Sequence, residues 1–202
     1  PTGLNFPGES NGFVPEHKNW SPTSFPTISF GQGLSVNAVQ VASVYSTIAN
    51  DGLRVEPSLV KRIIHEDGTA EQPAAPKTTR VVSRDTAIQV RAMLESVVGE
   101  GGTATNAKIP GYRVGGKTGT AQVIDELTGG YNDQVIASFV GMAPADNPQL
   151  VVGVFVSQPQ IGRYGGELAA PVFKKVSSYA LGALQIPPTG SKAPKLALTF
   201  GG

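Results

Sequence analysis

Apolar side chains recur at helical spacing in the segment 35–50, and this pattern predicts the first long helix of the chain. The apolar positions are Val36, Val39, Ala42, Val44, Tyr45 and Ile48. Ser35 stands where an N-cap residue belongs, and Asp51 and Gly52 follow as residues that tolerate the left-handed backbone of a helix end. The segment therefore predicts a capped helix with one apolar face.

A second helix is predicted over 83–99, with Ser83 or Asp85 as its N-cap and Gly99 at its end. Its apolar face comprises Ile88, Val90, Ala92, Leu94, Val97 and Val98. Between the two helices the segment 57–64 is short and rich in β-branched residues, which favours a strand.

The second half of the chain changes to a strand-forming pattern, with strands predicted at about 112–124, 134–143 and 149–157. The four residues 145–148 that join the last two strands permit only an antiparallel hairpin. A closing helix is predicted from about Gly166. Its apolar face comprises Leu168, Val172, Phe173, Val176, Tyr179, Ala180 and Leu184. Helices followed by an antiparallel sheet and a covering helix define the α+β class.

The composition excludes several classes of protein. The 202 residues carry 16 basic and 15 acidic side chains, so the chain lacks the basic footprint of a nucleic-acid-binding protein. With no cysteine and only two histidines, neither thiolate chemistry nor an ordinary zinc site is expected, and no cofactor or metal is predicted. No apolar run approaches the ~18–20 residues that a membrane-spanning helix needs.

The densest candidate site is GYRVGGKTGTAQ, residues 111–122. From Gly111 to Thr118 it satisfies the P-loop pattern of nucleotide-binding proteins, but Pro110 precedes it and strand-forming residues follow it. A second interpretation is a bulged, glycine-rich strand that carries a solvated Lys117. A third is the edge of an active-site cleft, built on a strand.

On such a strand Lys117 and Gly119 point to one face, and Thr118 and Thr120 point to the other. The missing side chain of Gly119 lets a substrate backbone approach the strand edge. A buried lysine amine and two hydroxyls are groups that bind a carboxylate, and the backbone N–H of Thr120 is a candidate oxyanion-hole donor.

The string GGKTGTAQ resembles the K-T-G motif of the penicillin-binding proteins and serine β-lactamases, whose motif set also contains S-x-x-K and S-x-N. TGLNFPGESNG near the start, ISFGQGLSVNAVQVASVYSTIANDG over 28–52 and YGGELAAPVF over 164–173 resemble one subfamily, the class B penicillin-binding proteins, and most closely its FtsI-like division branch. The resemblance implies a penicillin-binding-protein/serine β-lactamase-like transpeptidase fold. It places the C-terminal portion of a transpeptidase domain at 1–186 and a tail at 187–202.

The resemblance also implies a function: a serine-type peptidoglycan D,D-transpeptidase, expected to be septal, that binds stem peptides and is acylated by β-lactams. It gives catalytic roles to Lys117, Thr118, Gly119 and the N–H of Thr120, and substrate or β-lactam binding to Thr118, Thr120 and Tyr164. Arg163 is a further candidate, and Tyr131 either closes the cleft or packs on the surface. Cell-division glycosyltransferase and divisome proteins are the implied partners.

The motif order decides where the nucleophile is expected. Ser58 and Lys61 copy S-x-x-K, and Ser35 and Asn37 copy S-x-N, but they occur in the wrong order for the family. In addition, Ser58 lies in a strand-like run, where residues three apart point to opposite faces. We therefore expect the nucleophilic serine and the second motif upstream of Pro1, and we expect this chain alone to be inactive.

An upstream membrane anchor and an extracytoplasmic location follow from the resemblance alone. A D,D-carboxypeptidase, a β-lactamase or a β-lactam-sensing receptor of the same fold remain alternatives, because K-T-G is common to all of them.

Overall fold

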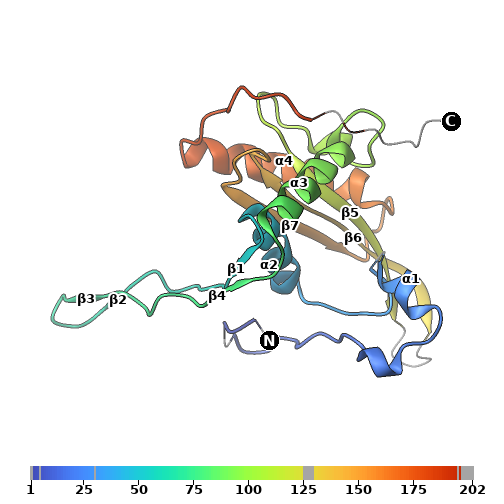
Figure 1. Ribbon diagram of the computed structural model, residues 1–202, viewed down its shortest axis with the longest axis horizontal. Coiled ribbons are helices and arrows are strands. Elements are labelled where there is room, and N and C mark those ends of the chain that lie inside the picture. Colours follow the sequence, from blue (N-terminus) through green and yellow to red (C-terminus); the bar gives the residue numbers. More distant parts are fainter. Residues whose placement is uncertain (1, 5, 30, 125–129, 195, 197–202) are drawn as a thin grey trace.

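A three-stranded antiparallel sheet in the order β5-β6-β7 forms the centre of the molecule in this computed structural model (Figure 1). The structure describes residues 2–4, 6–29, 31–124, 130–194 and 196, with only the backbone at 124, 131 and 132. The strands are β5 (Gly115–Ile124), β6 (Tyr131–Ala143) and β7 (Leu150–Ser157). The predicted antiparallel hairpin of the last two strands is confirmed, since Ala143 pairs with Leu150 and Ile136 with Ser157.

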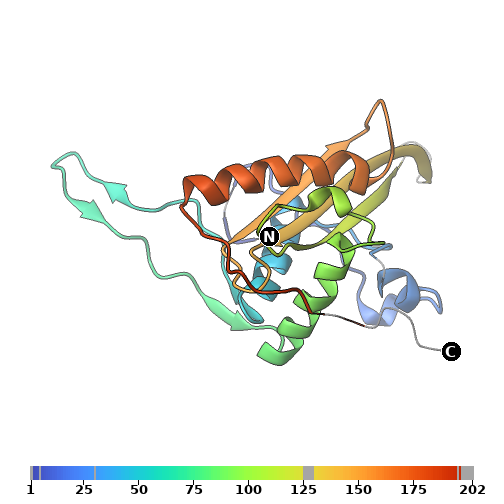
Figure 2. The ribbon, with the colours of Figure 1, turned by 90° about the horizontal axis from the view of Figure 1, so that it is seen from above.

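Helices cover both faces of this sheet, as Figure 2 shows from above. Helix α4 (Gly165–Ala183) lies along one face, whereas α3 (Arg84–Val98) packs against β5 from the other. Helix α2 (Ala38–Ala49) lies beside α3 and contacts β6 and β7. The short helices are α1 (Ser24–Ser29), η1 (His17–Asn19) and η2 (Thr105–Ala107). The predicted α+β class is confirmed.

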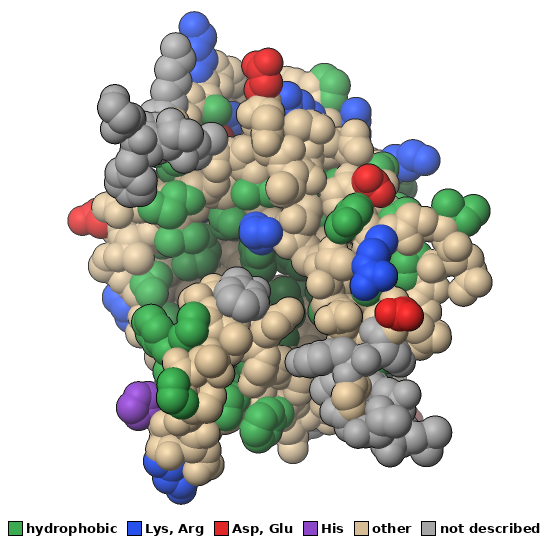
Figure 3. Space-filling model, turned by 90° about the vertical axis from the view of Figure 1, so that its right-hand side faces the viewer, with side chains coloured by type: hydrophobic (Ala, Val, Ile, Leu, Met, Phe, Trp, Pro, Cys, Tyr) green, Lys and Arg blue, Asp and Glu red, His purple; other side chains and the backbone are tan. Residues whose placement is uncertain are grey.

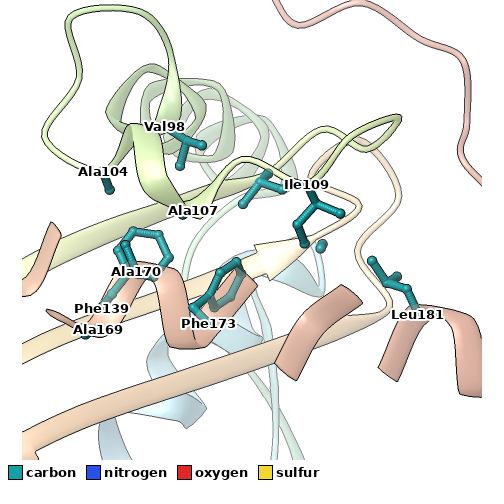
Figure 4. Packing of buried hydrophobic residues seen from close by; sticks show 11 residues of the cluster. Val98, Ala104, Ala107, Ile109, Phe139, Ala169, Ala170, Phe173 and Leu181 are labelled. Atoms are coloured by element: carbon teal, nitrogen blue, oxygen red, sulfur yellow. The ribbon is translucent and has the colours of Figure 1, made fainter. Parts of the chain in front are cut away.

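Two phenylalanines join α4 to the sheet (Figure 4). The rings of Phe139 on β6 and Phe173 on α4 meet edge to face with centroids 4.9 Å apart, and both side chains are fully buried. Such an aromatic pair contributes about 0.5–1.5 kcal/mol beyond the burial of its area. A β-carbon at Gly116 would lie 2.4 Å from Cζ of Phe139, and one at Gly141 would lie 3.1 Å from Cε2 of Phe173. The rings therefore occupy space that the two glycines leave free.

The buried face of α4 differs from the predicted one. Its fully buried side chains include Ala169, Ala170, Phe173, Ser177 and Leu181, of which only Phe173 belongs to the predicted face. The predicted residues Val172, Val176 and Tyr179 are 42%, 46% and 79% exposed. Small side chains let the helix axis approach the sheet, and a hydrophobicity pattern does not reveal this requirement.

The predicted N-cap is correct for α3 and wrong for α2. Ser83 caps α3, because its hydroxyl accepts a hydrogen bond from the N–H of Thr86. At α2 the cap is Asn37, whose side chain accepts from the N–H of Gln40 while the Gln40 side chain accepts from the N–H of Asn37. The predicted cap Ser35 instead pairs through its backbone with Phe13. The reciprocal capping box satisfies two backbone donors, whereas a serine two residues earlier reaches neither.

A buried arginine connects α3 to the end of α2. The guanidinium of Arg91 donates to the carbonyl oxygens of Ile48 and Ala49 at 3.1 and 3.2 Å and to the carboxylate of Asp51 at 2.7 Å. Asp51 has a φ of 50°, the left-handed conformation expected at this helix end. Arg91 therefore neutralises Asp51 and satisfies carbonyl groups that α2 leaves without intrahelical partners.

A narrow two-stranded ribbon projects from the body between α2 and α3 (Figure 1). At its base β1 (Leu53–Val55) pairs with β4 (Thr78–Arg80), and near its tip β2 (Ile63–Ile64) pairs with β3 (Ala70–Glu71). The strand predicted over 57–64 forms only at its last two residues. The facing segment 72–77 contains two prolines, which have no N–H to donate to a ladder.

No helix in the described part of the chain is long and apolar enough to cross a membrane. The predicted tail, 187–202, has no regular secondary structure at 187–194, and positions 195 and 197–202 lie outside the described residues.

The carboxyl group of Asp51 provides a pH test of this fold. The hydrogen bond from Arg91 is the main cause that holds the pKa of Asp51 below its usual range, and the charges of Arg91 and Arg84 add to it. A lowered pKa stabilises the folded state above the unfolded value of about 3.9, and this stabilisation is lost as the pH falls through the lower folded value. Asp51→Asn should therefore lower the free energy of unfolding at pH 7 by on the order of 1 kcal/mol, and the thermal midpoint with it.

The difference in thermal midpoint between wild type and Asp51→Asn should become smaller as the pH falls below about 4. Thermal unfolding at a series of pH values measures this difference. Asp85→Asn is the control, because Asp85 is exposed in the first turn of α3, and its thermal midpoint at pH 7 should differ much less from that of wild type. If wild type and Asp51→Asn differed in thermal midpoint by the same amount at pH 7 and pH 3, the assigned role of the Asp51 charge would be contradicted.

Candidate active site

The Lys117–Thr120 segment lies in the middle of β5, at the edge of the sheet. In the described residues β5 pairs only with β6, so its second edge is open. Thr118 pairs with Phe139, which packs against α4, and Lys117 pairs with Val140 on the opposite face. The predicted alternation of the motif along a strand is therefore confirmed. The P-loop alternative is wrong, because a P-loop needs a helix to begin at its lysine, and here the strand continues to Ile124.

The polar groups of the motif are accessible to solvent. The Lys117 ammonium donates to the backbone oxygen of Thr118 at 3.0 Å and to its hydroxyl at 3.3 Å. Lys117 and Thr120 are exposed and Thr118 is half-buried, so the expectation of a buried amine is wrong for the described residues. An accessible ammonium beside hydroxyl groups is suited to bind an anionic group of a ligand.

Residues close to the motif include two that the sequence did not single out. The hydroxyl of Thr103, in the turn after α3, lies 3.2 Å from the hydroxyl of Thr118. The side chain of Asn106 donates to the carbonyl oxygen of Gly166 at 3.1 Å and so fixes this turn to the start of α4. No local sequence pattern distinguishes Thr103 from the other threonines around it.

The start of α4 approaches the motif strand very closely. A β-carbon at Gly165 would lie 2.0 Å from the backbone oxygen of Ser138 and 2.8 Å from that of Gly119. A β-carbon at Gly166 would lie 2.0 Å from the backbone oxygen of Thr103. The two glycines therefore allow α4, the turn after α3 and β5 to meet at one place.

Tyr164 occupies the N-cap position of α4 and directly precedes this close approach. Its side chain makes no capping hydrogen bond and is 60% exposed, which leaves its ring free to contact a ligand. Its predicted role in ligand binding stays a prediction. Arg163 donates to the backbone oxygen of Asp133 at 3.4 Å, and the side chain of Tyr131 lies outside the described residues.

The copies of S-x-x-K and S-x-N occupy structural positions. Ser58 and Lys61 lie on the ribbon that projects from the body, remote from β5 (Figure 1), and the Ser58 hydroxyl donates to the backbone oxygen of Val60. The side chain of Asn37 caps α2 and also donates to the backbone oxygen of Ser10. These contacts agree with the interpretation that neither copy is a catalytic motif.

An apolar hollow in the surface lies away from the motif strand. This hollow, of about 470 Å³, lies between α2 and the base of the ribbon, not at β5, and its lining includes Val44, Ile48 and Val82. On the face shown in Figure 3, basic and acidic side chains are scattered among hydrophobic and other groups. The described residues contain no group of three or more His, Asp or Glu that could hold a metal ion.

Comparison with known proteins identifies the family. The model of the penicillin binding protein transpeptidase domain matches residues 1–178. Penicillin-binding protein PbpB of Mycolicibacterium smegmatis is 40% identical over 98% of this chain and 32% of its own length. The "probable peptidoglycan D,D-transpeptidase PbpC" of Pseudomonas aeruginosa is 40% identical over 93% of this chain and 32% of its own length.

A solved structure agrees with these matches. Penicillin-binding protein 3 from Mycobacterium tuberculosis, complexed with ampicillin, has a TM-score of 0.89 and 39% identity, covering 99% of this chain and 46% of that one. The chain therefore belongs to the penicillin-binding protein transpeptidase family and has its α+β fold. It spans about a third of the length of the curated relatives named above, at 32% of each.

The close approach at α4 predicts opposite effects for two glycine substitutions. In Gly166→Ala the new methyl group would meet the backbone of Thr103, so we expect a loss of about 1–3 kcal/mol in the free energy of unfolding. In Gly182→Ala, near the other end of the same helix, the methyl group meets no atom within 4 Å other than its chain neighbours and the backbone of its own helix, so we expect a gain of up to about 1 kcal/mol. Chemical denaturation measures both changes, and equal stability of the two variants would contradict the packing described.

Proposed function

We propose that the protein is a serine-type peptidoglycan D,D-transpeptidase, and that this chain supplies the K-T-G wall of its active site. One observation carries the proposal: the Lys117–Thr120 segment lies accessible on the open edge of β5, in a chain of the transpeptidase family. An open strand edge can pair with the backbone of an extended peptide, which is the form that a stem peptide presents.

The proposed reaction has two acyl-transfer steps. A serine Oγ attacks the carbonyl carbon of the D-Ala–D-Ala bond, the C–N bond breaks, and the terminal D-Ala leaves as an amine with the proton that the serine lost. The amine of a neighbouring stem peptide then attacks the ester. The ester C–O bond breaks, the amine loses a proton, and the serine Oγ is protonated again.

The motif residues have distinct roles in this mechanism. Lys117 supplies positive charge and hydrogen bonds to the serine network, and the hydroxyls of Thr118 and Thr120 bind the substrate carboxylate. The N–H of Thr120 stabilises the oxyanion of the tetrahedral intermediate. Gly119 permits the close approach of the substrate, and Tyr164 lines the site beside it.

The nucleophile is proposed to belong to a part of the protein that precedes this chain. Both serine motif copies in the chain lie in structural positions, and the chain covers only 46% of the solved relative. We place the end of this portion of the domain at Ile186, whose carbonyl oxygen accepts from the Tyr112 hydroxyl at 2.6 Å, and the tail at 187–202. This chain alone is then inactive.

β-Lactams acylate the same serine, because they imitate the D-Ala–D-Ala unit and keep an anionic group in the place of its carboxylate. Ampicillin in the Mycobacterium tuberculosis structure and aztreonam in a second structure of that protein support this part of the proposal. A septal role, divisome partners, an upstream membrane anchor and an extracytoplasmic location complete the proposal. Formation of cross-linked peptide would distinguish the transpeptidase from a carboxypeptidase, a β-lactamase or a receptor of the same fold.

Covalent labelling tests this proposal. The intact protein, meaning this chain joined to the rest of its polypeptide, should be labelled by a fluorescent penicillin, and this chain alone should not. Lys117→Ala and Thr120→Val should each slow labelling of the intact protein, with a loss of about 10²–10³-fold for Lys117→Ala, similar to the loss of other groups that stabilise the transition state.

Lys108→Ala is the matched control, since Lys108 is an exposed lysine before β5 that makes no ion pair in the described structure. Its labelling rate should equal that of wild type. Unchanged labelling of the Lys117→Ala, Thr120→Val double variant would contradict the site, and labelling of the isolated chain at Ser58 or Ser35 would contradict the placement of the nucleophile.

A further inference from the structure

The hydroxyl of Thr118 has two polar neighbours within the protein. The Lys117 ammonium donates to it at 3.3 Å, and the Thr103 hydroxyl lies 3.2 Å away. A hydroxyl group has one proton to donate and two lone pairs that accept. Because an ammonium group has only protons to offer, Lys117 occupies one lone pair of Thr118. The direction of the single Thr118 proton therefore depends on Thr103.

We propose that Thr103 is a positioning residue that donates to Thr118 and so directs the Thr118 proton toward the carboxylate of an incoming ligand. With Lys117 and Thr103 both donating, the two lone pairs of Thr118 are occupied. Its proton then points away from both donors, where a carboxylate can accept it. This inference rests on the proposed function, and it adds a residue outside the K-T-G motif to ligand recognition.

The fold holds Thr103 on both sides. Before it, a β-carbon at Gly102 would lie 2.2 Å from the backbone oxygen of Val97, so the chain turns tightly against the end of α3. After it, the N–H of Ala104 donates to the same oxygen at 2.9 Å, and the Ala104 side chain is fully buried. The turn that carries Thr103 is thus fixed to α3 as well as to α4.

The contacts of Thr103 and its neighbours suit a positioning role better than a packing role. The Thr103 side chain is exposed, and within the described structure its hydroxyl forms a hydrogen bond only with Thr118. Its backbone oxygen lies against Gly166, and the Asn106 amide fixes that glycine at 3.1 Å. The backbone therefore secures the position of the hydroxyl, while the hydroxyl itself contributes little to stability.

A hydrogen bond in the opposite direction, from Thr118 to Thr103, predicts a different effect on the rate of acylation. If Thr118 donated to Thr103, its only proton would be occupied, and a carboxylate ligand would have to displace that hydrogen bond. Removal of the Thr103 hydroxyl would then free the proton and speed the reaction with a carboxylate ligand. The sign of the effect therefore distinguishes the two arrangements.

The experiment compares one β-lactam as the free carboxylate and as its methyl ester, with the intact protein. The measured quantity is the second-order rate constant of acylation for wild type, Thr103→Val and Thr103→Ser. Thr103→Val should slow acylation by the carboxylate form about tenfold, because a hydrogen bond to a charged group is misdirected. It should leave the rate with the ester within about twofold, and Thr103→Ser should restore the wild-type rate with both forms.

Thr105→Val is the matched control, because Thr105 is an exposed threonine two residues away whose hydroxyl makes no hydrogen bond within the described structure. Its rates should equal those of wild type. A thermal midpoint of Thr103→Val close to that of wild type shows that the variant is folded, and Thr103→Ser tests the hydroxyl without a change of fold.

Three results would overturn the role of Thr103 alone: equal losses with the carboxylate and the ester, no change with either, or faster acylation by the carboxylate. Each of them presupposes that wild type is acylated. Failure of wild type to react with either form would instead overturn the proposed function, and the role of Thr103 with it.

Discussion

Helix α4 approaches the sheet at a distance that only glycine allows, and most of the site depends on this contact. Gly165 lies against the backbones of β5 and β6, and Gly166 lies against the turn after α3. The same approach sets Phe173 edge to face with Phe139 in the core. One packing constraint therefore fixes the motif strand, the turn that carries Thr103 and the exposed Tyr164 relative to one another. The positions of the proposed functional residues therefore depend on glycines that carry no functional group themselves.

The motif combines a rigid backbone with accessible side chains. β5 is held on one edge by β6, while its other edge is open in the described residues and presents Lys117 and Thr120 to solvent. Open strand edges favour aggregation in many proteins, and charged side chains such as lysine reduce that tendency. In the proposed mechanism the same open edge is where the peptide backbone of a substrate pairs, so the accessible lysine serves both solubility and recognition.

Periodicity located the regular elements well and their local details less well. The second long helix with its Ser83 cap, the hairpin of β6 and β7 and the closing helix were all predictable, because each depends on local pattern and capping chemistry. The α2 cap was predicted at Ser35, although Asn37 and Gln40 have the three-residue spacing of a capping box, which is also a local pattern. The strand predicted over 57–64 is shorter in the structure because the segment that faces it contains prolines. The buried face of α4 differs from the predicted one because close packing against the sheet favours alanine and serine over valine.

The sequence by itself determined the family and the motif strand, because GGKTGTAQ is contiguous and its residues alternate as any strand does. Only the tertiary structure decided what surrounds that strand. The hydroxyls of Thr103 and Thr118 are fifteen positions apart in the chain and meet at 3.2 Å, and Asn106 reaches Gly166 across sixty positions. Local pattern carries no information on such contacts, because they arise from helices that pack on a common sheet.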